Sequence, residues 1–410
     1  MSARLWMIWT ATRDSLWFIP AVMTFCTAAL AVALVEAERS GRVSVGDVNH
    51  WLWGGGAEGA QQMLSTIASG LITVTGVVFS VTTVALQLAS SQFTPRVLRN
   101  FTSDRSNQVV LGVFISTFTY TLLVLRVVRS SAPDQPPFVP RLAILISLVM
   151  VLISIGFLIY YINHAARSMQ IAYILQQVTR RSIEQVEQVF PHTLGRPSEH
   201  DLTEFPFPET QGVAVYPRHA GYLQAVDEHS LFHLGQRKNQ LIRMERWIGE
   251  FVLPSQPLAT VWSPQDIDEA MLQSIRESFV LGHERTPEQD IEFGIIEIAD
   301  IALKALSPAI NDPTTAQNCI DRLAEILSLL ASRDPLHPTR TQQGRIHFQA
   351  LYTDFGRAVD LAFRQIRHAG ADHPVIREKL LSTVELLIAA VPDSRKPPLI
   401  DLAIKLRGNP

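Results

Sequence analysis

Apolar residues in the first part of the chain form four long stretches, over residues 16–35, 63–88, 109–128 and 142–162. Each stretch contains almost no charged residue, and each is long enough to cross a hydrocarbon core of about 30 Å, which takes about 20 helical residues. Inside a membrane the backbone must satisfy its own hydrogen bonds, and a helix does so within one segment. The pattern therefore predicts a domain of about four transmembrane helices over residues 1–165.

The pattern after the fourth stretch is typical of a water-soluble region. A helical period over residues 167–190, followed by several prolines, predicts a connecting helix and linker over residues 166–205. Short alternating runs then predict five strands between residues 212 and 262. We assign these strands to a small β-barrel or sandwich, a domain of residues 206–262.

Helical spacing returns at residue 263 and continues through the last part of the chain. The expected helices cover residues 266–279, 290–306, 314–331, 345–367 and 373–391. This part is predicted to be a mostly helical soluble domain of residues 263–410. The expected fold class is a membrane α-helical bundle of about four transmembrane helices plus a soluble α+β C-terminal region.

The second apolar stretch carries polar and small residues at alternating steps of three and four. They are Thr66, Ser69, Thr73, Gly76, Ser80, Thr83 and Gln87, with Ser90 and Thr94 continuing the series. Because a helix turns once in 3.6 residues, this spacing places them on one face. The positions between them are largely apolar.

Two explanations fit this polar face. Serine, threonine and glycine let transmembrane helices approach closely, so the face can be a packing interface. Alternatively, the seven residues from Thr66 to Gln87 line a water-filled path, where hydroxyls and amides replace part of an ion's hydration. The face is uncharged, so by itself it sets no strong preference between anions and cations.

Polar and basic residues continue just beyond this helix. Gln92, Arg96 and Arg99 are expected at the cytoplasmic mouth of such a path, where they would form a basic collar. The alternative for each arginine is ordinary anchoring at the membrane interface, with the guanidinium reaching toward water.

The distribution of arginines predicts the orientation. Four crossings put both termini on one side, which would carry Arg4, Arg13, Arg96, Arg99, Arg105, Arg167, Arg180 and Arg181. The other side would carry Arg39, Arg42, Arg126, Arg129 and Arg141. Because positive residues concentrate in cytoplasmic loops, both termini are expected to be cytoplasmic.

Composition narrows the function further. The chain is 47% hydrophobic and 18% charged, with a net charge of −3, so there is no basic excess of the kind that nucleic-acid binding needs. Two cysteines provide neither a disulfide framework nor a cysteine metal site. No phosphate-binding glycine loop, nucleophile elbow or zinc-protease motif is present, so we expect no enzyme activity and no cofactor.

The soluble region offers two candidate sites. Ser307, Asn311 and Asp312 lie in the turn LSPAINDP before an expected helix. Asp312 with Pro313 is typical of a helix cap, and the free N–H groups of the same helix start could instead bind an anion. An acidic neighbourhood from His283 to Asp300 matches no known metal loop, so we assign no metal site there.

Four segments resemble the bacterial integral-membrane family catalogued as domain of unknown function 2254. They are VVFSVTTVALQLASSQFTPRVLRNF at 77–101, GYLQAVD at 221–227, the block from FVLGHERTPEQD to NDPTTA at 279–316, and FRQIRHAG at 363–370. Ala309 departs from the family pattern, which often has glycine there. The resemblance implies a multi-pass protein of the bacterial inner membrane and implies no particular activity.

These observations favour a homo-oligomeric membrane channel or passive transport protein with the second transmembrane helix lining the path. Several copies are needed because one chain offers one such polar face. The expected partners are the lipid bilayer, further copies of the chain and small ions. The alternative is a membrane-anchored sensor or scaffold, in which the polar face only packs helices and the soluble domain binds a ligand or protein.

Overall fold

The computed structural model describes residues 12, 15–41, 56–92, 104–130, 137–189, 196–197, 212–263, 266–334, 338–342 and 345–408. The chain divides into two compact units. We call Ile8–Gln170 the membrane unit and Ile171–Pro410 the soluble unit.

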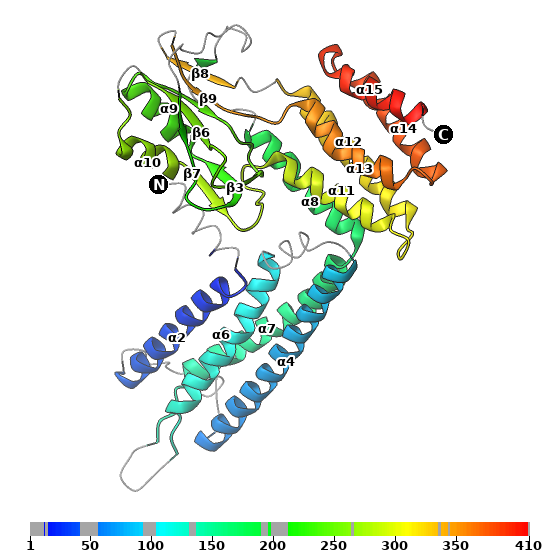
Figure 1. Cartoon of the computed structure of the whole chain (residues 1–410). Helices are drawn as coiled ribbons and strands as arrows, with labels where there is room; N and C mark the ends of the chain where they lie inside the picture. Colours follow the sequence, from blue (N-terminus) through cyan, green and yellow to red (C-terminus); the bar gives the residue numbers. More distant parts are fainter. Residues whose placement is uncertain are drawn as a thin grey trace. The chain divides into compact units, whose positions relative to one another are not determined.

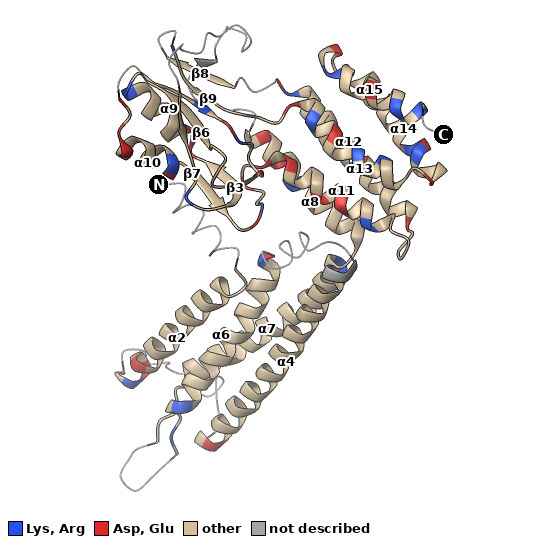
Figure 2. Ribbon diagram, in the orientation of Figure 1, with Lys and Arg blue, Asp and Glu red and all other residues tan. Residues whose placement is uncertain are grey.

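The membrane unit contains four long helices, as the sequence predicts. They are α2 (Phe18–Arg39), α4 (Ala57–Gln92), α6 (Arg105–Val127) and α7 (Arg141–Ser168) (Figure 1). All four are long and apolar enough to cross a membrane, and Figure 2 shows few charged residues along them. The fold is thus that of a multi-pass membrane protein.

Helix α6 lies at the centre of the membrane unit and packs against the other three helices. It is the most buried of the four. Hydroxyl pairs join it to α7, with 2.9 Å between Thr121 Oγ1 and Ser147 Oγ and 3.2 Å between Thr117 Oγ1 and Ser154 Oγ. These hydroxyl pairs lie in the interior of the membrane unit, between α6 and α7.

The soluble unit contains two open sheets. The strands are β1 (Arg196–Pro197), β2 (Val213–Val215), β3 (Gly221–Val226), β4 (Leu241–Met244), β5 (Phe251–Val252), β6 (Ala259–Trp262), β7 (Phe279–Gly282), β8 (Thr339–Gln342) and β9 (Arg345–Gln349). One sheet has the order β1-β8-β9-β4-β6-β2 and the other β5-β3-β7. All neighbours are antiparallel except β4 and β9.

The five strands expected between 212 and 262 are confirmed as β2 to β6, but the expected barrel or sandwich is not. No sheet closes among the described strands, because β1 and β2 form the two edges of the larger sheet. The sheets also use β7, β8 and β9 from the region expected to be helical. Side chains from both sheets and from α9 (Glu228–Arg237) and α10 (Glu269–Glu277) share one apolar core, which includes Leu223, Ile242 and Phe348.

The remaining helices of the soluble unit form a bundle. They are α8 (Ile171–Val189), α11 (Ile291–Ala305), α12 (Pro313–Ser332), α13 (Phe355–Ala369), α14 (Pro374–Ala390) and α15 (Lys396–Arg407). Helix α11 packs against α8, α12 and α13 and is buried along most of its length. The helix expected over 345–367 is wrong in its first part, because residues 345–349 form β9 and the helix begins after its cap, Asp354.

Candidate functional site

Helix α4 packs against the rest of the membrane unit through one seam. The buried residues of this seam are Ala60, Leu64, Ala68, Leu71, Val78, Thr82 and Ala85. At its C-terminal part the seam is polar, since Thr82 Oγ1 lies 2.7 Å from Tyr161 Oη of α7. Tyr161 also donates to the carbonyl oxygen of Val78, at 3.0 Å. These contacts fix which side of α4 faces inward.

The predicted polar face lies on the opposite side of α4. Its members Thr66, Ser69, Thr73, Gly76, Ser80, Thr83 and Gln87 are all exposed in the single chain. Thr66, Thr73, Ser80 and Gln87 each follow a seam residue by two positions, for example Ser80 after Val78. At about 100° per residue this offset is about 200°, which is nearly a half-turn. Helix packing within one chain therefore does not explain the polar face.

The hydroxyls of this face differ in their partners. Thr66, Thr73 and Thr83 each donate to the carbonyl oxygen four residues earlier, at 2.8 to 2.9 Å. For Ser80 and Gln87 the described part of the chain provides no hydrogen-bond partner. A side-chain amide in hydrocarbon without a partner costs several kcal/mol, so Gln87 requires water, a headgroup or a second protein chain.

Among the described residues nothing crowds the position of Gly76. A Cβ built on Gly76 would meet no described atom within 4 Å, and the same holds for Gly70. Glycine also lowers helix stability relative to alanine. A close approach of something outside the chain would explain its presence on this face.

The expected cytoplasmic mouth falls largely outside the described residues. Arg96 and Arg99 are not described, and Gln92 is the last residue of α4, with its side chain not described. The collar formed by these three residues stays a prediction.

The turn of Ser307, Asn311 and Asp312 joins α11 to α12. Asp312 Oδ1 accepts from the backbone N–H of Thr315 at 3.0 Å, and Pro313 is the first residue of α12, as expected for a cap. Ser307 Oγ donates to the carbonyl oxygen of Lys304, and Asn311 has a left-handed backbone with φ of 47°. Capping thus accounts for Asp312, while anion binding at this turn stays untested.

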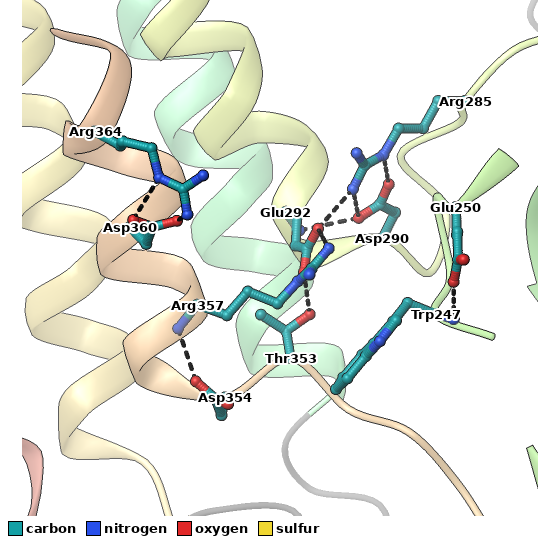
Figure 3. A network of polar contacts seen from close by, with 10 residues as sticks. All are labelled: Trp247, Glu250, Arg285, Asp290, Glu292, Thr353, Asp354, Arg357, Asp360 and Arg364. Carbon is teal, nitrogen blue, oxygen red and sulfur yellow. Dashed lines mark hydrogen bonds and ion pairs between the residues drawn. The ribbon is translucent and has the colours of Figure 1, made fainter. Parts of the chain in front are cut away.

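A network of charged side chains lies at the starts of α11 and α13 (Figure 3). Arg285 binds Asp290 through two nitrogens and reaches Glu292 Oε2 with Nη2 at 2.9 Å. Arg357 binds Glu292 from α13, with Nη2 3.1 Å from Oε2, and Thr353 Oγ1 donates to Oε1 at 2.8 Å. The side chains of Asp290 and Glu292 are each only 1% exposed.

Burial acts on the two carboxylates with different results. Burial raises the pKa of Asp290, and its contact with Arg285 does not cancel this effect. Burial also raises the pKa of Glu292, but hydrogen bonds from Arg357, Thr353 and Arg285 outweigh it and leave the pKa below its usual value. The three hydrogen bonds thus favour the charged form of Glu292.

The loop between β4 and β5 completes the network. The Arg357 guanidinium lies 5.2 Å from the centre of the Trp247 ring, a cation–π contact. Gly249 has a φ of 86°, and a Cβ there would lie 2.4 Å from Asp290 Oδ2. The network therefore ties the sheets to the starts of α11 and α13, a role that the sequence did not reveal because its members are far apart along the chain.

The network also explains two residues of the acidic neighbourhood found in the sequence. Asp290 and Glu292 face two arginines, and Asp290 caps α11 by accepting from the N–H of Glu292 at 3.1 Å. Among the described residues no three histidine, cysteine or acidic side chains lie together as a metal site would need. An aspartate just before an apolar helical run was the one signal for the cap.

Comparison with known proteins gives the family and no activity. A family model described as predicted membrane protein (DUF2254) matches residues 13–385. Similar proteins include uncharacterized protein Rv1290c of Mycobacterium tuberculosis (strain ATCC 25618 / H37Rv) and uncharacterized protein Mb1321c of Mycobacterium bovis. Each is 34% identical over 331 residues, which cover 78% of this chain and 62% of the relative.

The chain thus spans less than two thirds of the length of these mycobacterial relatives. No solved structure matches it. The four apolar helices agree with the description of the family, and the family model covers most of the chain. This chain therefore belongs to the family of predicted membrane proteins DUF2254.

Proposed function

We propose that this protein is a homo-oligomeric channel or passive transport protein, in which α4 helices from several copies line a water-filled path. The observation that carries the proposal is the exposure of the whole polar face of α4, from Thr66 to Gln87, opposite the seam that packs on α6 and α7. In lipid such a face is unfavourable, whereas around a symmetry axis it would contact water.

The flanks of the polar face support the same arrangement. Val77, Phe79 and Val84 are exposed beside it, at 58%, 63% and 49%. These apolar side chains suit contact with lipid or with a neighbouring copy, whereas the polar face between them suits contact with water. Because the polar face carries no charge, it fits a path that discriminates only weakly between small anions and cations.

Localisation follows from the same proposal. We place the protein in the bacterial inner membrane with both termini cytoplasmic, as the arginine distribution favours. The basic collar of Gln92, Arg96 and Arg99 would then lie at the cytoplasmic mouth of the path.

One observation favours the alternative, a sensor or scaffold whose α4 helices only pack together. The hydroxyls of Thr66, Thr73 and Thr83 are satisfied within their own helix, so they tolerate a dry contact with another helix. In that arrangement the soluble unit would carry the function by binding a ligand or protein.

Measuring ion flux from reconstituted vesicles distinguishes the channel from the sensor or scaffold. Ser80→Leu places a bulky apolar group on the polar face and is expected to reduce flux by narrowing or dewetting the path, with the oligomer intact. Val77→Leu, on the lipid-facing flank of the same helix, is the matched control and is expected to leave flux unchanged. Wild-type protein that assembles but releases no ions would overturn the channel and favour the sensor.

A further inference from the structure

A small pocket lies where three helices of the soluble unit meet. It is lined by Arg367, His368, Gly370 and Ala371 at the end of α13, by Arg377 and Leu380 in α14, and by Lys405 and Leu406 in α15. Its polar side chains are all basic or histidine, and no acidic residue lines it. Figure 2 shows the lysine and arginine positions of these helices in blue.

The packing of the helices gives the pocket a fixed wall. Gly370 is buried, and a Cβ there would lie 2.6 Å from Ile376 Cγ2, so the end of α13 and the start of α14 are held close together. Arg377 is anchored across the pocket, because its Nε donates to the carbonyl oxygen of Leu406 at 3.1 Å. This bond uses one guanidinium nitrogen and leaves the other two for a further acceptor.

The charges of the lining are only partly neutralised. Lys405 Nζ binds Asp401 Oδ2 at 2.5 Å, and the contact of Arg367 is with a nitrogen of His368, at 3.3 Å. The lining holds three cations, Arg367, Arg377 and Lys405, and the one carboxylate of Asp401 neutralises a single positive charge, which leaves two. The first turn of α14 contributes no acidic residue, and its start has no side-chain cap.

We propose that this pocket binds a dianionic phosphoryl group. The free volume is about 40 Å³. A single water occupies roughly 10 to 15 Å³, so a space of this scale suits a few waters or one tetrahedral oxyanion. A phosphate carries about −1.5 to −2 charges at neutral pH, which matches the two unneutralised cations better than a carboxylate does. The forked donors of Arg367 and Arg377 suit its oxygens.

The phosphoryl group could belong to free inorganic phosphate or to a lipid headgroup, and titration calorimetry of the full chain in detergent distinguishes them. Inorganic phosphate is expected to bind saturably, with one site per chain. Dihexanoyl phosphatidic acid is the second probe. If it displaces phosphate and binds more tightly, the source is a phospholipid. If it binds no better than phosphate, the source is a soluble phosphate.

Variants test the assignment of the site. Arg367→Gln and Arg377→Gln are each expected to weaken phosphate binding about tenfold or more, since each removes a charge-assisted hydrogen bond. Arg364→Gln is the matched control, because Arg364 lies on α13 outside the pocket and pairs with Asp360. The proposal is overturned if wild-type protein shows no saturable binding at millimolar phosphate. In the described part of the chain Arg367 makes no bond to the backbone of α15, so its substitution does not disturb the packing there. The proposal is also overturned if Arg367→Gln binds phosphate as tightly as Arg364→Gln does.

Discussion

Arg357 and Glu292 join two helices whose starts lie far apart along the chain. Arg357 Nη2 lies 3.1 Å from Glu292 Oε2, and the Glu292 side chain is 1% exposed whereas that of Arg357 is 41% exposed. The buried carboxylate of Glu292 thus accepts hydrogen bonds from two arginines and from the Thr353 hydroxyl. We therefore expect substitution of Glu292 to lower the stability of the soluble unit more than substitution of any other residue of the network.

Removing the charge of Glu292 should destabilise the soluble unit. Glu292→Gln keeps the shape but leaves Arg285 and Arg357 without their shared carboxylate, which costs about 3 kcal/mol of unfolding free energy. Asp290→Asn should cost less, because burial already disfavours the charged form of Asp290 and asparagine still caps a helix. Denaturant unfolding of the full chain measures both.

An exposed ion pair provides the control for this comparison. Asp360 and Arg364 form a pair on the surface of α13, and Asp360→Asn should change the stability by less than about 1 kcal/mol. If Asp360→Asn and Glu292→Gln lowered the unfolding free energy equally, the buried network would contribute no more to stability than an exposed ion pair does.

Acid should remove the contribution of Glu292. Its pKa is lower in the folded than in the unfolded chain, so its stabilisation is complete above the unfolded value and is lost as the pH falls through the folded value. The difference in unfolding free energy between wild type and Glu292→Gln should therefore shrink below about pH 4. A difference that is constant from neutral to acid pH would contradict the charge of Glu292 as the cause.

Gly249 should not tolerate a side chain. Gly249→Ala is expected to destabilise the fold by at least about 1 kcal/mol, since alanine is strained at positive φ and its Cβ would meet Arg285 and Asp290. A thermal melt of the full chain measures the effect. An unchanged melting temperature would mean that the loop between β4 and β5 is not held against the network.

The cap of α12 predicts a smaller effect. Asp312→Ala should cost about 1 kcal/mol, because the N–H of Thr315 loses its acceptor, whereas Asp312→Asn should cost less, because asparagine also caps helices. Thermal melts rank the two variants. Equal stability of all three proteins, with an altered ligand response in Asp312→Ala, would point to a binding site at this turn instead.

Local sequence signals were enough to predict several elements. The four apolar helices, the strands β2 to β6 and the start of α12 at Pro313 all follow from hydrophobic spacing or from a cap with proline. Helix α15 was missed because Pro397 and Pro398 suggest a break, although both lie in its first turn, where proline is tolerated.

Elements that depend on distant partners were not predictable in this way. Residues 345–349 form a strand because β9 pairs with β8 and, in parallel, with β4, about a hundred residues earlier. Arg285 and Arg357 meet at Glu292 only after α11 and α13 have packed together. The polar face of α4 was predicted from spacing, but its position opposite the packing seam required the contacts of Val78 and Thr82.

The association of copies through α4 can be tested by oxidative cross-linking. A cysteine at Gly76 is exposed and should form a disulfide with the same residue of a second copy if α4 helices meet at close range. A cysteine at Val78, which is 1% exposed and packs inside the chain, should not. Native Cys26 is exposed and is replaced by alanine first, whereas burial raises the pKa of the Cys319 thiol to about 12 and leaves it inert.

Water access to the polar face tests the central claim most directly. Single cysteines at Thr66, Ser69, Thr73, Ser80, Thr83 and Gln87 are treated in membrane vesicles with a water-soluble, membrane-impermeant thiol reagent. Val78, inside the chain, and Val84, an exposed apolar residue beside the polar face, are the two controls. A water-filled path predicts reaction at the six polar positions and none at either valine. Six unreactive cysteines in an assembled oligomer would contradict the path and leave α4 as a packing helix.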